Sequence, residues 1–249
     1  MTTASVRQAL VEQWRFRADS EAQAALRFRG LHRRLGAHGA SQTVLELCER
    51  AIADERRHRD ACAREAERWG GAPRADTALT EVAAPRIGDS PERRLQFEIA
   101  TMCCVVESVN ATYLAEIIRR ATDPGIRERT RAILADEVWH ARLGWLFLRE
   151  SRADLSWMSP LLPSLLRSST EDELWRSGSD EVVDESVGLL GRSTLQELLV
   201  ATTTSVILPG LAHFGLDERP ARRWLAQLET RLEAHGVAPS VGPVQRPPR

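Results

Sequence analysis

The chain has 249 residues, of which 43% are hydrophobic and 28% are charged. That is enough to bury the core of one domain or of two small ones, which excludes a disordered chain. All 34 basic residues are arginine, and 35 acidic residues bring the net charge to -1. The absence of lysine excludes Schiff-base, pyridoxal-phosphate and P-loop chemistry. The near-zero net charge disfavours nucleic acid as a partner.

The distribution of apolar residues along the chain predicts a soluble, cytoplasmic protein. No apolar run approaches the roughly 20 residues that span a bilayer, and the N-terminal segment lacks the apolar core of a secretory signal. The four cysteines, Cys48, Cys62, Cys103 and Cys104, contain no C-x-x-C pair. In a reducing compartment we expect thiols there, and neither disulfides nor a zinc ribbon.

The apolar residues recur at intervals of three and four, and strand-like alternation is scarce, so the sequence predicts an all-α fold. Ser41, Ser90-Pro91 and Asp123-Pro124 are typical helix starts. The expected helices cover residues 5–35, 41–69, 90–121, 123–150, 194–207 and 218–235. A connection of about twenty residues separates the second helix from the third, long enough for these two to run parallel across a bundle.

These elements predict three regions. Residues 1–152 should form a four-helix bundle with a long crossover between its second and third helices. Residues 153–236 should form a helical extension packed on the bundle, and the proline-rich residues 237–249 a flexible tail.

Two copies of the pattern D-E-x-x-H are the most informative feature of the chain. They run from Asp54 to His58 and from Asp136 to His140, each in the middle of an expected helix, and they are the only E-x-x-H matches. A glutamate precedes each copy on the previous helix, Glu21 in one case and Glu107 in the other. Both glutamates fall on apolar stripes, so we expect them to point inward.

This spacing predicts a metal centre. Residues three apart share one face of a helix, so each Glu-x-x-His pair can direct two ligand atoms to one point. Four ionised carboxylates in an apolar bundle would each cost several kcal/mol without a partner, and two divalent cations would balance them. Oxygen-rich ligation with one imidazole per metal favours iron or manganese. The residues assigned as catalytic and as metal ligands are Glu21, Glu55, His58, Glu107, Glu137 and His140, with Glu55 and Glu137 as bridges. The alternative is that arginines pair with these glutamates.

At these residues the sequence resembles the ferritin-like di-iron carboxylate superfamily, over residues 5–150. The pattern of both motifs and both upstream glutamates is similar to that of the p-aminobenzoate N-oxygenase group, which has a further histidine where this chain has Ile133. The segment from Asp54 to His58, with Cys62 one turn later, is similar to one in soluble bacterial multicomponent monooxygenases.

The resemblance implies further roles around the metals. Asp54 and Asp136 would accept hydrogen bonds from the outer nitrogens of the histidines, crossing between the repeats. Cys62 would line a substrate cavity, and Gly144, a glycine inside a helix one turn after His140, could leave space for the same cavity. Two alternatives remain open: Cys62 could be redox-active, and Gly144 could instead allow close helix packing.

The implied function is a di-iron oxidase or oxygenase that uses O2 to hydroxylate or N-oxygenate a small organic substrate. Its cofactors would be two iron ions, or a manganese–iron pair, with O2 as co-substrate. It would need an electron donor such as a ferredoxin or a flavin reductase, and a homodimer is compatible with this reading. The alternative of a different class is a ferroxidase or iron-storage protein, whose substrate is iron itself.

Overall fold

The computed structural model describes residues 3–73, 86–169 and 182–234. Within these ranges the chain is helical, and its only β feature is an isolated bridge between Asp184 and Leu189. The all-α class is therefore confirmed. The expected flexible tail, residues 237–249, and most of the expected crossover lie outside the described residues.

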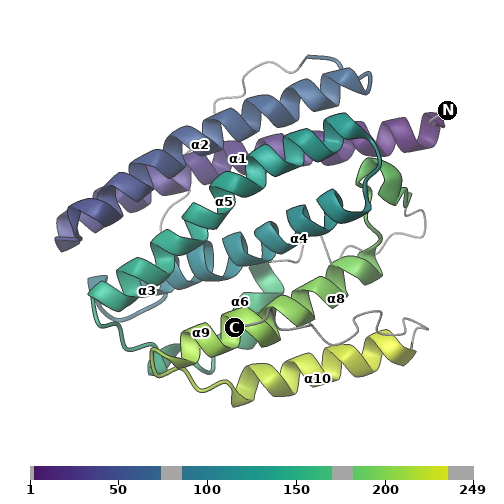
Figure 1. The fold of residues 1–249 in the computed structure, drawn as a ribbon. Coiled ribbons are helices and arrows are strands. Elements are labelled where there is room, and N and C mark those ends of the chain that lie inside the picture. Colours follow the sequence, from purple (N-terminus) through teal and green to yellow (C-terminus); the bar gives the residue numbers. More distant parts are fainter. Residues whose placement is uncertain (1–2, 74–85, 170–181, 235–249) are drawn as a thin grey trace, which may run out of the picture.

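The first two helices, α1 (Ala4–His38) and α2 (Gln42–Arg68), form an antiparallel pair packed along their length (Figure 1). Helix α1 continues three residues beyond the expected end at Leu35 and stops at Gly39, whose φ of 77° is readily adopted by glycine. The Ser41 hydroxyl caps α2 by accepting from a backbone N–H of its first turn, as the sequence indicated.

The third long helix has an internal irregularity that the sequence did not predict. It begins as α3 (Pro91–Ile99), passes through a π-helical segment, η1 (Ala100–Val106), and continues as α4 (Glu107–Arg120). A π-helical turn changes which side chains face the core, and such turns are frequent at functional sites. Here it ends directly before one of the predicted ligands, Glu107.

Helix α5 (Pro124–Glu150) begins where expected, with the Asp123 carboxylate accepting from the Ile126 N–H at 2.8 Å. It packs against both α4 and α2 (Figure 1). The described helices thus make a continuous series of neighbours, α1 on α2, α2 on α5, and α5 on α4.

The C-terminal region packs on the face of α4 and η1 (Figure 1). Its elements are η2 (Ser156–Met158), α6 (Leu162–Ser169), η3 (Glu185–Val187), α8 (Arg192–Thr202), η4 (Thr203–Ile207), α9 (Leu208–Ala212) and α10 (Arg219–Ala234). The expected helix end at Ile207 is wrong, because a second π-helical turn, η4, carries the helix past Pro209. Helix α10 packs against α6 and α8.

Two helical stretches correct the expectation that no segment is apolar enough for a membrane. Pro91–Arg120 and Arg192–Ala212 are each long and apolar enough to cross one, judged by length and composition alone. They contact each other, and 50% and 44% of their apolar windows are buried inside the protein. This burial is typical of core helices of a soluble protein, and a cytoplasmic location stays a prediction.

The buried apolar residues form two clusters. One includes Phe28 and Leu143, and the other includes Trp14, Cys62 and Ile133. On α1, α2 and α5 the predicted ligands lie in sequence between residues of the first cluster and residues of the second. The metal-binding candidates therefore occupy a polar layer with apolar packing on both sides.

Candidate metal centre

The six predicted ligands come from α1, α2, α4 and α5, and all of them are buried. Their exposed fractions lie between 0% and 6%. Ligand atoms of Glu21, Glu55, His58 and Glu137 all lie within 4.8 Å of one another, as do those of Glu55, Glu107, Glu137 and His140. Either group could hold a metal ion, and the two groups share Glu55 and Glu137.

The group around His58 has the spacing of ligands without the ion between them. His58 Nδ1 lies 3.6 Å from Glu137 Oε1, 3.7 Å from Glu55 Oε2 and 4.0 Å from Glu21 Oε2. These distances are too long for hydrogen bonds. Both His58 Nδ1 and Glu55 Oε2 are buried without a hydrogen-bond partner among the residues that the structure describes. Ligand atoms about 2.1 Å from one divalent ion lie roughly 3 to 4 Å apart, so a cation fits these orphaned atoms.

The group around His140 is more tightly connected. His140 Nδ1 lies 3.0 Å from Glu137 Oε2 and 3.1 Å from Glu55 Oε1. The edge of the Phe28 ring packs on the imidazole, with the ring centroids 5.3 Å apart. The imidazole therefore has one fixed orientation, with Nδ1 directed at the two shared carboxylates.

The electrostatics of the carboxylates show how much charge is concentrated here. Burial, and then the charge of neighbouring carboxylates, raises the pKa of Glu21 and of Glu107 well above the ordinary value. Burial acts in the same direction on Glu55, but the hydrogen bond from His140 and the charge of that imidazole outweigh it and lower its pKa to about 2. In the metal-free protein, some of these carboxyl groups must therefore be protonated, because no metal ion balances their negative charge.

The histidines are also held from outside, by aspartates of the opposite repeat. His58 Nε2 lies 3.2 Å from Asp136 Oδ2, and His140 Nε2 lies 3.3 Å from Asp54 Oδ2. Each imidazole can donate its Nε2–H to the aspartate and keep Nδ1 free for a metal. The hydrogen bonds cross between the two repeats, as the resemblance implied.

Two arginines of α2 complete this arrangement, and the sequence analysis missed their role. Arg57 Nη2 lies 2.6 Å from Asp54 Oδ1 and 3.1 Å from Asp136 Oδ2. Arg50 also contacts both aspartates, at 3.4 and 3.2 Å. The spacing of four residues from Arg50 to Asp54, and of three from Asp54 to Arg57, is the signal that could have indicated these pairs.

The alternative in which arginines neutralise the buried glutamates is not what the structure has. Among the described residues, no arginine forms an ion pair with the four glutamates of the two ligand groups, and Arg50 and Arg57 pair with the aspartates instead. The nearest other polar contact is the amide of Asn110, which donates to Glu137 Oε1 at 3.1 Å.

The two remaining predicted positions differ in their surroundings. Cys62 is fully buried in the second apolar cluster, and burial raises the pKa of its thiol, which disfavours the reactive thiolate. Gly144 does not face open space: a Cβ there would lie 2.6 Å from Cys103 Cβ and 2.8 Å from Cys104 Sγ. Of the two roles left open for Gly144, this contact supports close packing of α5 on η1.

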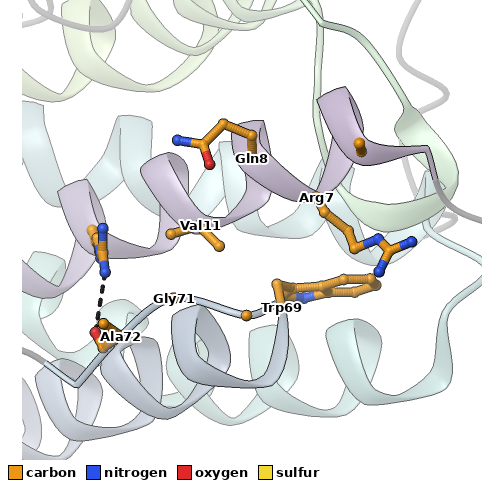
Figure 2. A pocket seen from close by; sticks show the side chains of 9 residues that line it. Arg7, Gln8, Val11, Trp69, Gly71 and Ala72 are labelled. Carbon is orange, nitrogen blue, oxygen red and sulfur yellow. Dashed lines mark hydrogen bonds between the residues drawn. The ribbon is translucent and has the colours of Figure 1, made fainter.

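A separate pocket of about 450 Å³ lies between the start of α1 and the end of α2 (Figure 2). Its lining includes Arg7, Val11, Arg15 and Trp69, and Arg15 donates to the carbonyl of Ala72 at 3.0 Å. None of the predicted ligands lines it.

No protein-family model, curated protein or solved structure matches this chain. The inferences about its function therefore rest on the residues and geometry described above.

Proposed function

We propose that this chain is a di-iron carboxylate oxidase or oxygenase, built on a ferritin-like four-helix bundle with a crossover between α2 and α3. In this proposal it uses O2 to hydroxylate or N-oxygenate a small organic substrate. The six ligands are those predicted from the two D-E-x-x-H segments and the two upstream glutamates. A manganese–iron pair would use the same donor set.

One observation carries the proposal. Two ligand groups, each with one histidine, share the carboxylates of Glu55 and Glu137. Shared carboxylates between two groups are the arrangement expected for two metal ions held side by side, one Glu-x-x-His from each of two helices and one glutamate from each of two others. Four carboxylates and two neutral imidazoles match the charge of two divalent cations.

Two bound ferrous ions would supply the two electrons that activate O2. The chain's own residues contribute in three ways. Glu55 and Glu137 would hold both ions, and Asp54 and Asp136 orient the imidazoles by accepting from their outer N–H groups. The apolar clusters on both sides of the polar layer exclude water, which strengthens electrostatic interactions inside it.

The enzyme is better supported than the ferroxidase or storage protein. Iron that arrives as cargo needs an acidic entry path, because carboxylates attract Fe²⁺ and guanidinium groups repel it. Arg50 and Arg57 cover Asp54 and Asp136 on the side that faces solvent, and their side chains are 47% and 59% exposed. This surface disfavours passage of cations directly to the histidines.

The first experiment combines metal analysis with reaction with O2. Protein produced in iron-supplemented medium should hold about two iron ions per chain and should change its absorption spectrum when the reduced protein meets O2. The variant Glu55→Gln should lose both properties, whereas Glu128→Gln, an exposed glutamate of α5, should keep them. Iron or manganese at trace level only would contradict the proposal.

A second experiment separates the enzyme from the storage protein. The enzyme should elute from size-exclusion chromatography as a small assembly and release an oxidised organic product from a panel of aromatic amines and phenols. Elution as a large cage that loads many irons per chain would overturn the preference for an enzyme.

A further inference from the structure

We infer that the outer surface of α2 and α5 above the two histidines docks an acidic protein that carries single electrons. This inference rests on the proposed function, because only a metal centre that reacts with O2 needs such a donor. We call the surface the arginine face and define it by Arg50, Arg57, Trp139 and Arg142.

The charges of the arginine face are arranged in layers. The guanidinium groups of Arg50 and Arg57 are outermost, with side chains 47% and 59% exposed. The carboxylates that balance them lie beneath, 2% exposed for Asp54 and 17% for Asp136. Arg142 adds a third exposed guanidinium that stacks on Trp139, 4.9 Å from the ring centroid. At these positions positive charge lies outside negative charge, and the exposed acidic groups of α2 nearest to them are Glu46 and Glu49.

The stretch of α5 that borders the face has no exposed acidic group, and the exposed Glu128 and Glu150 lie outside it. Between positions 131 and 142 the exposed residues of α5 are Arg131, Ala132, Ala135, Val138 and Arg142. None of these is acidic. Positive charge at the rim of a surface accelerates the encounter with an acidic partner, which is the usual requirement for brief contacts between electron carriers.

The centre of the face has the shape for close approach. Ala53 of α2 and Ala135 of α5 are exposed and short, and Val138 is 54% exposed. Trp139 lies half-buried between two guanidinium groups, with Arg50 at 5.4 Å and Arg142 at 4.9 Å from its ring centroid. Small and aromatic side chains surrounded by charge are typical of the small interfaces of transient complexes.

The arginine face also lies close to the predicted metals. From Arg50 the contacts run to Asp54 at 3.4 Å and from Asp54 to His140 at 3.3 Å. A parallel series runs through Asp136 to His58, at 3.2 Å in each step. A docked carrier would therefore be separated from a ligand imidazole by two polar contacts.

The electron count determines how often a one-electron carrier must dock. One reduction of the site takes two electrons, so two molecules of a one-electron carrier must each be oxidised once and leave in turn. Repeated docking requires fast association and fast release, which steering by exposed charges provides without a large interface.

The test compares two reductants on the iron-loaded protein in stopped-flow experiments. One is a plant-type [2Fe–2S] ferredoxin, an acidic protein, and the other is dithionite with a viologen mediator. The test variant is Arg142→Glu, because Arg142 contacts Trp139 and neither aspartate. The control is Arg149→Glu, because Arg149 is an exposed arginine two turns further along α5. Iron content is measured for each protein first.

We expect Arg142→Glu to lower the second-order rate with ferredoxin about ten-fold at low salt and to weaken its salt dependence. The rate with the mediator should stay within about two-fold, and Arg142→Lys should recover most of the ferredoxin rate. Equal ferredoxin rates for the Arg142→Glu and Arg149→Glu proteins would overturn the docking site while leaving the metal centre intact. Absence of iron from the unmodified protein would instead refute the proposed function.

Discussion

The two D-E-x-x-H segments have the same pattern, but their histidines lie at different distances from the carboxylates around them. In the second segment, His140 Nδ1 approaches Glu137 and Glu55 to 3.0 and 3.1 Å. In the first, His58 Nδ1 lies 3.6 Å or more from Glu137, Glu55 and Glu21 and has no hydrogen-bond partner within the described part of the chain. Asn110 donates to Glu137 Oε1, the oxygen of the shared carboxylate that lies beside His58.

This difference shows that a motif supplies ligands while its neighbours determine how firmly they are held. Arg57 and Trp139 occupy the same position in the two segments, so only the first segment brings its own arginine. Both arginines that hold the aspartates come from α2. The second half of the site therefore depends on the helix that carries the first.

The largest expected effect comes from removing a shared carboxylate. Glu137→Gln should reduce the iron content from about two per chain to nearly none, because both ligand groups contain Glu137. Glu21→Gln should leave about one iron per chain, since Glu21 belongs to one group only. Elemental analysis of the purified variants measures both values, and equal losses in the two variants would show that the halves do not share their ligands.

The next largest effect concerns the aspartates. Asp54→Asn and Asp136→Asn should each lower iron affinity about 10- to 100-fold, the usual range when the partner of a ligating histidine is changed. The loss should fall on the opposite repeat, so that Asp54→Asn weakens the ion at His140. Chelator competition gives the affinities, and site occupancies from crystals show which ion is lost. Loss of the ion at His58 in the Asp54→Asn protein would refute the crossed arrangement.

A smaller effect is expected at Gly144, which lies four residues after His140, where the first repeat has the larger Cys62 four residues after His58. Gly144→Ala should lower the free energy of unfolding by about 1–3 kcal/mol, because the added Cβ meets Cys103 and Cys104 and overpacks the core. Gly36→Ala is a matched control in a helix, with no atom within 4 Å of the added Cβ, and it should leave stability unchanged or slightly higher. Equal melting temperatures for the two variants would mean that α5 has room to move away from η1.

The smallest expected effect is a pH dependence of the metal-free protein. Glu21 and Glu107 keep their protons in the folded state at pH values where the unfolded chain has lost them, since their pKa values are raised above 4.5. The folded state therefore binds more protons, and the free energy of unfolding must fall as the pH rises above about 4.5. Burial alone would lower the pKa of His58, but its carboxylate neighbours raise it above 6.5, which adds the same slope at higher pH.

Bound metal should replace these protons and flatten the dependence. Urea denaturation between about pH 5 and pH 8, with and without iron, gives the comparison. A metal-free protein that becomes more stable as the pH rises would show that the carboxylates are paired with fixed positive charge.

The sequence predicted the parts of this structure that depend on local patterns. The starts of α2, α3 and α5 follow from Ser41, Ser90 and Asp123, whose side chains accept hydrogen bonds from the first helical turn. The six buried ligands follow from helical spacing combined with apolar stripes. Both kinds of signal lie within a few residues along one helix.

The features that sequence reasoning missed depend on contacts between helices or on backbone geometry. The π-helical turns before Glu107 and before Pro209 have no residue pattern that separates them from ordinary helix. Arg50 reaches Asp136 on another helix, a contact that exists only after α2 and α5 pack. Gly144 could not be distinguished from a cavity residue until the position of Cys103 was known.

The most direct test is a crystal structure of iron-loaded protein, with anomalous diffraction recorded at the iron edge. Two peaks should lie between Glu55 and Glu137, one beside His58 and the other beside His140. A map without iron peaks in this layer, or with a single ion that contacts neither shared carboxylate, would contradict the di-iron centre.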